Sequence, residues 1–248
     1  EICSRDWSSD VCSSDLTLIA LFRAEVNDEV STAYLWSDTE VYAFADDAQK
    51  MFCRLTGGLP DATSSLTTIA CTAGQKFVSI SPKILRLKSV ENPVTEQRCQ
   101  ILNYEDMDRF SNLTFGQYDY GYVAQTSIDN RVGVIRAVVS GMEPNKLRLV
   151  YIPEVDQNLN LIVNRLPLID INSTTVGNST AVLEIDEMHH RHLILWMKAL
   201  AHMKQDAETF NQGKAAEFDM AFRQYCLQAK HDRELHEHKY RTVSYGGI

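Results

Sequence analysis

Residues 34–61 read YLWSDTEVYAFADDAQKMFCRLTGGLPD and contain one helix together with its start and its stop. Ser37 and Glu40 have the spacing of a capping box, in which each side chain bonds the backbone amide of the other residue. The run Gly57-Gly58-Leu59-Pro60 is typical of a helix C-terminus. Between these limits the apolar spacing predicts a core-facing stripe. Its members are Val41, Phe44, Ala48, Met51 and Leu55.

Three other segments have helical periodicity, one before this stretch and two near the end of the chain. Their apolar positions are Ile19, Phe22, Val26, Val30 and Ala33; then Ile185, Met188, His192, Leu195, Ala199 and Met203; then Phe218, Phe222, Tyr225 and Ala229. Burying these stripes together predicts a bundle of two N-terminal and two C-terminal helices.

The middle of the chain changes to the period of two that is typical of strands. Short apolar runs on either side of residues 72–75 predict a β-hairpin. Later alternating runs extend this pattern to an antiparallel meander, interrupted by an irregular, polar excursion over residues 103–131. The fold class is therefore α+β, a helical bundle with an inserted antiparallel β domain. The predicted parts are residues 17–60 and 184–238 for the bundle, 61–183 for the insert, and 239–248 for a flexible C-terminal tail.

Composition excludes several classes of protein. The 248 residues are 44% hydrophobic and 23% charged, as in an ordinary globular chain. No apolar run approaches the roughly 20 residues that a membrane-spanning helix needs, so we expect no membrane association. The formal charge of −9 disfavours a protein that grips nucleic-acid phosphates. Four cysteines (53, 71, 99 and 226) form no C-x-x-C pair, which favours free thiols over a zinc site.

The first sixteen residues are set apart from the fold. Trp7-Ser8-Ser9-Asp10 and Cys12-Ser13-Ser14-Asp15 are near-copies of one tetrapeptide. A short disordered repeat is one interpretation. We favour another, because Asp6 to Leu16 resembles a translated sequencing-library adapter. On that interpretation residues 1–16 are a non-native prefix, the native part begins near Thr17, and the true N-terminus is missing.

Two histidine clusters are the candidates for metal chemistry. Asp186 and His189, and likewise Glu187 and His190, have the i, i+3 spacing of carboxylate-bridged di-metal bundles. The second cluster comprises His231, His236 and His238 with Glu234 and Glu237. Such a site also needs carboxylates from the other two helices, where only Glu25 and Glu29 are available. We favour the alternative, with His189 and His190 beside the core and His236 and His238 on a solvated helix end, and expect no bound metal or cofactor.

Motifs of nucleophilic catalysis and nucleotide binding are absent from the sequence. There is no G-x-S-x-G elbow and neither a P-loop nor a G-x-G-x-x-G run. Asp119 and Asp129 fall in the polar excursion, where solvation of a loop explains their presence without a catalytic role. Trp36, Phe44 and Trp196 are expected to be core anchors. We therefore expect no catalytic residue and no enzyme activity.

Several segments, in their order along the chain, resemble the head-to-tail adaptor proteins of tailed bacteriophages, including the tail-tubular-A-like connectors. The resemblance covers nearly all of Thr17 to about Leu235. It rests on Tyr34–Asp38 leading into Asp46–Lys50, on Ala73–Phe77, Ser81–Leu87 and Arg165–Leu168, and on Lys204–Phe210. The long excursion at 103–131 departs from the clearest tail-tube adaptors.

The resemblance implies a structural virion protein at the head–tail junction, made in the host bacterial cytoplasm. It implies a ring, usually of twelve copies, between the portal protein and a tail or nozzle protein. DNA would pass through the ring channel only as cargo. The resemblance also places the portal contact in the C-terminal tail, at Tyr240, Arg241 and Tyr245.

Two alternatives stay open at this point. The first is a tail completion or neck protein of the same particle, which differs from an adaptor in its partner. The second belongs to another class, a metal-carboxylate bundle enzyme, and would bind iron or manganese stoichiometrically.

Overall fold

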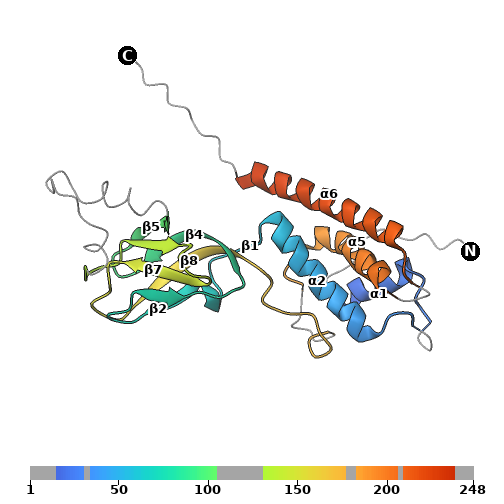
Figure 1. The fold of residues 1–248 in the computed structure, drawn as a ribbon, viewed down its shortest axis with the longest axis horizontal. Helices are drawn as coiled ribbons and strands as arrows, with labels where there is room; N and C mark the ends of the chain where they lie inside the picture. The colour runs from blue at the N-terminus through green and yellow to red at the C-terminus, as the bar shows by residue number, and fades with distance from the viewer. Residues whose placement is uncertain (1–14, 31–33, 105–130, 177–182, 206–208, 238–248) are drawn as a thin grey trace, which may run out of the picture. The chain divides into compact units, whose positions relative to one another are not determined.

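The computed structural model describes residues 15–30, 34–104, 131–176, 183–205 and 209–237 (Figure 1). Its helices are α1 (Asp15–Glu25), α2 (Asp38–Thr56), α5 (Glu187–Met203) and α6 (Gln212–Glu237). Its strands are β1 (Leu59–Asp61), β2 (Thr68–Cys71), β3 (Phe77–Ser79), β4 (Ile84–Asn92), β5 (Gln97–Asn103), β6 (Ala137–Ser140), β7 (Lys146–Val150) and β8 (Gln157–Arg165), with a 3-10 turn η1 (Ser65–Thr67) before β2. The α+β prediction is confirmed.

Contacts divide the chain into two compact units. The helical unit comprises residues 1–58 and 167–248, and the β unit comprises residues 59–166. The predicted limits of the inserted β domain, residues 61 and 183, stay a prediction.

Helix α2 begins and ends as its sequence predicts. The Ser37 hydroxyl accepts a hydrogen bond from the Glu40 amide at 3.4 Å, and the Ser37 amide donates to Glu40 Oε2 at 2.9 Å. Gly57 ends the helix with a φ of 90°, a left-handed conformation that glycine adopts without strain. The buried face is rotated from the predicted one, because Phe44, Met51 and Leu55 are half-buried. Its buried apolar members are Val41, Ala45, Ala48, Phe52 and Cys53.

Helix α1 is shorter than predicted. The stripe to Ala33 predicted one long helix, but α1 ends at Glu25 and the Val30 side chain is 63% exposed. Asn27 adopts a φ of 56°, which breaks the helical path, and the Asp28 amide then bonds the Arg23 carbonyl at 2.9 Å. Ala33 lies outside the described residues. The periodic spacing beyond Glu25 was therefore misleading.

Helix α5 lies at the centre of the helical unit, and α6 runs along it (Figure 1). Helix α5 also packs against α1 and α2, which explains why it is buried on more than one side. Large side chains from several helices fill the interior. Fully buried examples are Phe22, Leu193, Ile194, Met197 and Phe222.

The β unit is a mixed, curled sheet and not the predicted antiparallel meander. The strand order is β1-β8-β4-β5-β6-β7-β3, with β2 also paired to β8. All pairs are antiparallel except β5 with β6, which are parallel. A parallel pair needs a long connection to return the chain to the same end of the sheet. More than thirty residues separate β5 from β6, so this connection is available.

The predicted hairpin around residues 72–75 is also wrong. The chain does turn there, with the Gln75 amide bonding the Thr72 carbonyl at 3.1 Å. However, β2 pairs with β8 and β3 pairs with β7. The turn thus carries the chain from one side of the curled sheet to the other, over a core that includes Ile69, Val78, Val90, Leu147, Leu159 and Leu161.

None of the helices in the described part of the chain combines the length and the apolar character that crossing a bilayer requires.

Candidate functional site

The first candidate site is the segment before α2 that carries the resemblance. Trp36 is only 2% exposed, and its ring lies edge-on to Phe22, with 6.0 Å between the ring centroids. His202 of α5 contacts it from another direction at 6.5 Å. The prediction that Trp36 is a core anchor is confirmed, and its position fixes where α2 begins.

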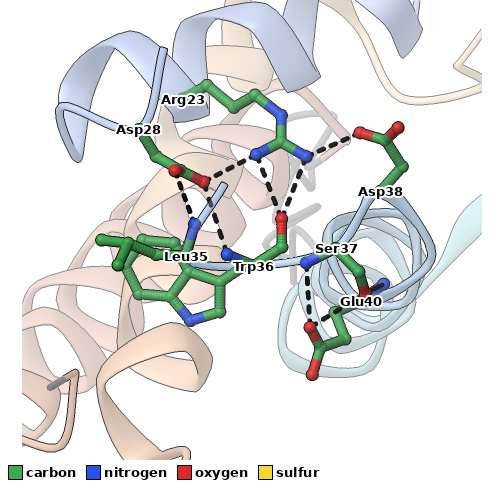
Figure 2. Close-up of polar contacts among 7 residues, drawn as sticks. All are labelled: Arg23, Asp28, Leu35, Trp36, Ser37, Asp38 and Glu40. Carbon is green, nitrogen blue, oxygen red and sulfur yellow. Dashed lines mark hydrogen bonds and ion pairs between the residues drawn. The ribbon is translucent and has the colours of Figure 1, made fainter. Parts of the chain in front are cut away.

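A buried arginine organises the polar groups around Trp36 (Figure 2). Arg23 Nη1 lies 2.6 Å from Asp28 Oδ2, and Nη2 lies 2.6 Å from Asp38 Oδ1. Both nitrogens also donate to the Trp36 carbonyl at 3.2 Å. The side chains of Arg23 and Asp28 are 7% and 2% exposed, so the pair is enclosed by protein.

Asp28 completes this cluster by holding the backbone before α2. Its Oδ1 accepts from the Leu35 amide at 2.8 Å, and its Oδ2 lies 3.5 Å from the Trp36 amide (Figure 2). The carboxylate thereby satisfies two backbone donors as well as the guanidinium. The sequence did not identify Arg23 or Asp28 as a partner of Trp36.

The start of α2 is tied to the end of α5. Lys204 Nζ lies 2.7 Å from Glu40 Oε1, in the Lys204–Phe210 segment of the resemblance. Hydrogen bonds from Lys204 and then from the Ser37 backbone lower the pKa of Glu40 from its ordinary value. Residues 206–208 of that segment lie outside the described residues.

The Asp46–Lys50 run anchors the segment that follows the β unit. Asp46 Oδ1 accepts from the Ile171 amide at 3.0 Å, and Gln49 Nε2 donates to the Ile169 carbonyl at 3.0 Å. Asp47 Oδ2 accepts from the Trp196 indole at 2.7 Å, which also confirms Trp196 as an anchor. These polar residues therefore join elements that are more than 100 residues apart in sequence.

The Arg165–Leu168 segment has a similar structural role in the β unit. Arg165 forms an ion pair with Asp61, and their side chains are 11% and 5% exposed. Burial alone would raise the pKa of Asp61, but hydrogen bonds from Ser64, the Thr63 amide and Arg165 hold that pKa well below its ordinary value. The pair fixes β1 beside the end of β8.

The first histidine cluster packs against α6. His189 Nδ1 lies 2.7 Å from the Tyr225 hydroxyl, and the His192 ring stacks on the Tyr225 ring with 3.4 Å between centroids. His190 is 2% exposed and its Nε2 lies 2.7 Å from the Ile185 carbonyl. The Tyr225 hydroxyl, the Ile185 carbonyl and the Tyr225 ring are thus the partners of His189, His190 and His192 respectively.

The described members of the two histidine clusters are not grouped as metal ligands. His231 and His236 are exposed, and His238 lies outside the described residues. Glu25 forms an ion pair with Lys198, and Glu29 is exposed. Among the residues that the structure describes, no group of three histidine, cysteine or acidic side chains is arranged to hold a metal ion.

Burial of His189 and His192 makes stability depend on pH. Desolvation is the largest cause that lowers the pKa of each imidazole from its ordinary 6.5. Asp186 acts in the opposite direction on His189, while Arg191 lowers the pKa of His192 further. Below pH 6.5 the unfolded chain therefore takes up protons before the folded chain does.

We expect the unfolding free energy of the helical unit to be constant above pH 7 and to fall as the pH drops from 6.5 towards 5. His192→Gln should flatten this slope, because one of the two shifted groups is removed. Denaturant titrations at closely spaced pH values measure the effect. The control is His236→Gln, at an exposed position, which should leave the slope unchanged. Equal slopes in the parent protein and both variants would show that His192 does not contribute to the pH dependence.

The cysteines of the described part of the chain are Cys53, Cys71, Cys99 and Cys226. All four are buried, and none of them forms a disulfide with another described cysteine. Burial raises the pKa of Cys71 and Cys99 to about 11 and that of Cys226 to about 12. A thiol with such a pKa is protonated at neutral pH and is a poor nucleophile.

The predicted portal-contact residues, Tyr240, Arg241 and Tyr245, lie outside the described residues. Asp119 and Asp129 do so too. The described contacts at the resemblance segments bind the chain to itself, so the clusters around Trp36 and Asp46 are structural.

A family model with the description "SU10 adaptor protein" matches residues 16–241 of this chain, which span both units. A comparison with curated proteins gives no match.

Proposed function

The chain belongs to the SU10 adaptor protein family and is a structural adaptor of a bacteriophage particle; from this premise we propose that it forms a ring between the portal protein and the tail. The observation that carries the proposal is the family match over residues 16–241. Members of such a family are structural, which agrees with clusters whose side chains bind the chain to itself. The ring would continue the DNA channel and hold no catalytic site.

An exposed apolar stripe on α6 supports ring formation. Met220 and Leu227 are each 67% exposed, and Leu235 is 62% exposed. Leu227 lies seven residues after Met220, and Leu235 lies eight residues after Leu227, so 3.6 residues per turn place all three on one broad side of the helix. A closed ring needs one surface of each copy to meet a different surface of the next. We assign the α6 stripe, defined by Met220, Leu227 and Leu235, to one of these surfaces.

The negative net charge of the chain supports the proposal that DNA passes through the ring without binding to it. A formal charge of −9 repels phosphates, so DNA crossing the channel would not adhere to its wall. DNA is therefore proposed as cargo.

The proposed partners are the portal protein on one side and a tail or nozzle protein on the other. Tyr240, Arg241 and Tyr245 remain the proposed portal contact, which places the protein at the head–tail junction. The second candidate is a tail completion or neck protein, which would also form a ring but would bind only tail components.

We expect charge on the α6 stripe to prevent ring assembly. Met220→Lys combined with Leu227→Lys should leave a folded monomer, because two charges would be buried at the contact. Native mass spectrometry of the variant, mixed with the portal protein encoded in the same genome, measures its oligomeric state. His236→Lys is the control, because His236 is exposed and nine residues, two and a half turns, place it on the opposite side of α6 from Leu227. If the double variant still forms rings, the α6 stripe is not the contact surface.

A further inference from the structure

The chain leaves helix α2 through two consecutive glycines. Gly57 and Gly58 have φ values of 90° and 86°, in the left-handed region that glycine adopts without strain. The Gly57 amide donates to the Cys53 carbonyl, and the Gly58 amide donates to the same carbonyl at 2.6 Å. Gly58 is the last residue of the helical unit before the β unit begins. Gly57 and Gly58 are called the exit glycines below.

Arg233 of α6 binds the carbonyl groups on either side of Gly57. Its Nη1 donates to the Gly58 carbonyl at 2.7 Å, and its Nη2 donates to the Thr56 carbonyl. The last carbonyl groups of a helix have no partner within the helix, so a guanidinium can satisfy them from outside. Its planar fork suits two neighbouring acceptors, and a positive charge is favourable at this end of a helix.

This contact restricts residue 57 to glycine independently of its backbone conformation. A Cβ atom added at Gly57 would lie 2.9 Å from Arg233 Nη2. Non-bonded heavy atoms attract each other best at about 3.5–4.0 Å, so the guanidinium would have to move away. The end of α2 and the Arg233 side chain are thus fitted to each other, although they lie far apart in the sequence.

Arg233 also holds the C-terminal end of α6. Among the described side chains of residues 230–236, Arg233 is the one that is not exposed. Leu235 is 62% exposed, and Lys230, which lies 4.0 Å from Glu234, is 46% exposed. The last two turns of α6 therefore depend on Arg233 for their side-chain attachment to the helical unit.

We propose that Arg233 couples the C-terminal end of α6 to the exit glycines, so that displacing either one releases the other. In one state the guanidinium binds the two carbonyls. In the other state the exit glycines lose this restraint and the last two turns of α6 separate from α2. A coupling free energy acts equally in both directions, so a change at Gly57 reaches α6 and a change at Arg233 reaches α2.

The coupling gives the proposed portal contact a way to act on the rest of the chain. That contact, at Tyr240, Arg241 and Tyr245, lies beyond the end of α6 at Glu237. A partner that displaces the helix end as it binds would release the exit glycines, through which the chain continues to β1. This consequence rests on the proposed function, whereas the coupling itself is tested on the chain alone.

Amide hydrogen exchange of the whole chain, resolved by residue, tests the coupling. We expect Arg233→Met to speed exchange by at least about tenfold at the exit glycines, because two hydrogen bonds from a charged group are lost. The same variant should speed exchange in residues 234–237 by a similar factor, because the helix end loses its attachment. Circular dichroism checks that the variant folds.

Two comparisons separate local release from other effects. Lys230→Met is the matched control, because it removes an exposed cation from the same helix and should change exchange by about twofold at most. Leu193 is fully buried in α5, so its amide reports opening of the whole helical unit. We expect Arg233→Met to leave exchange at Leu193 unchanged.

Gly57→Ala tests the coupling from the other helix. The added methyl group displaces the guanidinium, so exchange in residues 234–237 should again rise by at least about tenfold. Combined with Arg233→Met, Gly57→Ala should add nothing there. Gly141→Ala is the control for backbone strain, because Gly141 has a φ of 87° and open space where its Cβ atom would lie. It should leave residues 234–237 unchanged.

The proposal is overturned if Arg233→Met exchanges like Lys230→Met at the exit glycines or in residues 234–237. Acceleration at Leu193 equal to that at the two helix ends would also overturn it, because Arg233 would then act through the stability of the whole unit. A folded Gly57→Ala with an unchanged end of α6 would do the same. If Gly57→Ala does not fold, Arg233→Met decides the test, since it adds no backbone strain.

Discussion

Arg23→Met is expected to lower the unfolding free energy of the helical unit by about 3–5 kcal/mol. The change leaves the Asp28 carboxylate, 2% exposed, without its guanidinium partner. An uncompensated buried charge is costly because the interior solvates it poorly. The Trp36 carbonyl loses both of its guanidinium donors at the same time.

Denaturant titration followed by tryptophan fluorescence measures this loss. Trp36 and Trp196 both lie in the helical unit, so their fluorescence follows that unit. Arg223→Met is the matched control, because Arg223 pairs with Asp219 at 2.9 Å but is 51% exposed. An exposed pair of this kind contributes about 0–1 kcal/mol.

The double variant Arg23→Met with Asp28→Asn distinguishes the effect of the unpaired buried charge from the effect of lost packing. Removing both charges should recover part of the loss, since no unpaired carboxylate stays buried. A single variant as stable as the parent would show that the Arg23 cluster does not hold α1 to the start of α2. Equal losses of unfolding free energy for Arg23→Met and Arg223→Met would show the same.

Phe222→Ala is expected to lower the unfolding free energy of the helical unit by a similar amount, about 3–5 kcal/mol. Phe222 is fully buried, and its ring centroid lies 5.3 Å from that of Trp196. Removing the ring leaves a cavity between α5 and α6, whose lining loses contact on one side. The same fluorescence titration reports the change, because Trp196 lines the new cavity.

Gln224→Ala is the control for Phe222→Ala. Gln224 is an exposed residue of the same helix, and substitutions at such positions shift stability by about 0.5 kcal/mol or less. A cost below about 1 kcal/mol for Phe222→Ala would contradict the packing of α6 on α5.

Local signals in the sequence predicted local structure well. The Ser37–Glu40 capping box and the glycine stop at Gly57 both lie within one helix and its ends. Their chemistry depends on neighbours three or four residues away, which a sequence displays directly. The resemblance segments likewise marked residues with structural roles, from Asp46 to Arg165.

Long-range pairing explains what the sequence did not predict. The end of α1 is set by Asp28 returning to Arg23 and to the backbone before α2, which no apolar period records. Strand order depends on which edges meet, and β8 pairs with β1, β2 and β4 across long separations. The predicted stripe of α5 included Met188 and Met203, which are 72% and 60% exposed, so a periodicity that assumes burial misassigned these two positions.

The adaptor account is tested most directly by mixing this chain with the portal protein encoded in the same genome and imaging the mixture by electron microscopy. The account predicts rings of this chain seated on the portal, and it predicts that removal of residues 238–248 releases them. A chain that stays monomeric and unbound in the presence of assembled portal would contradict it.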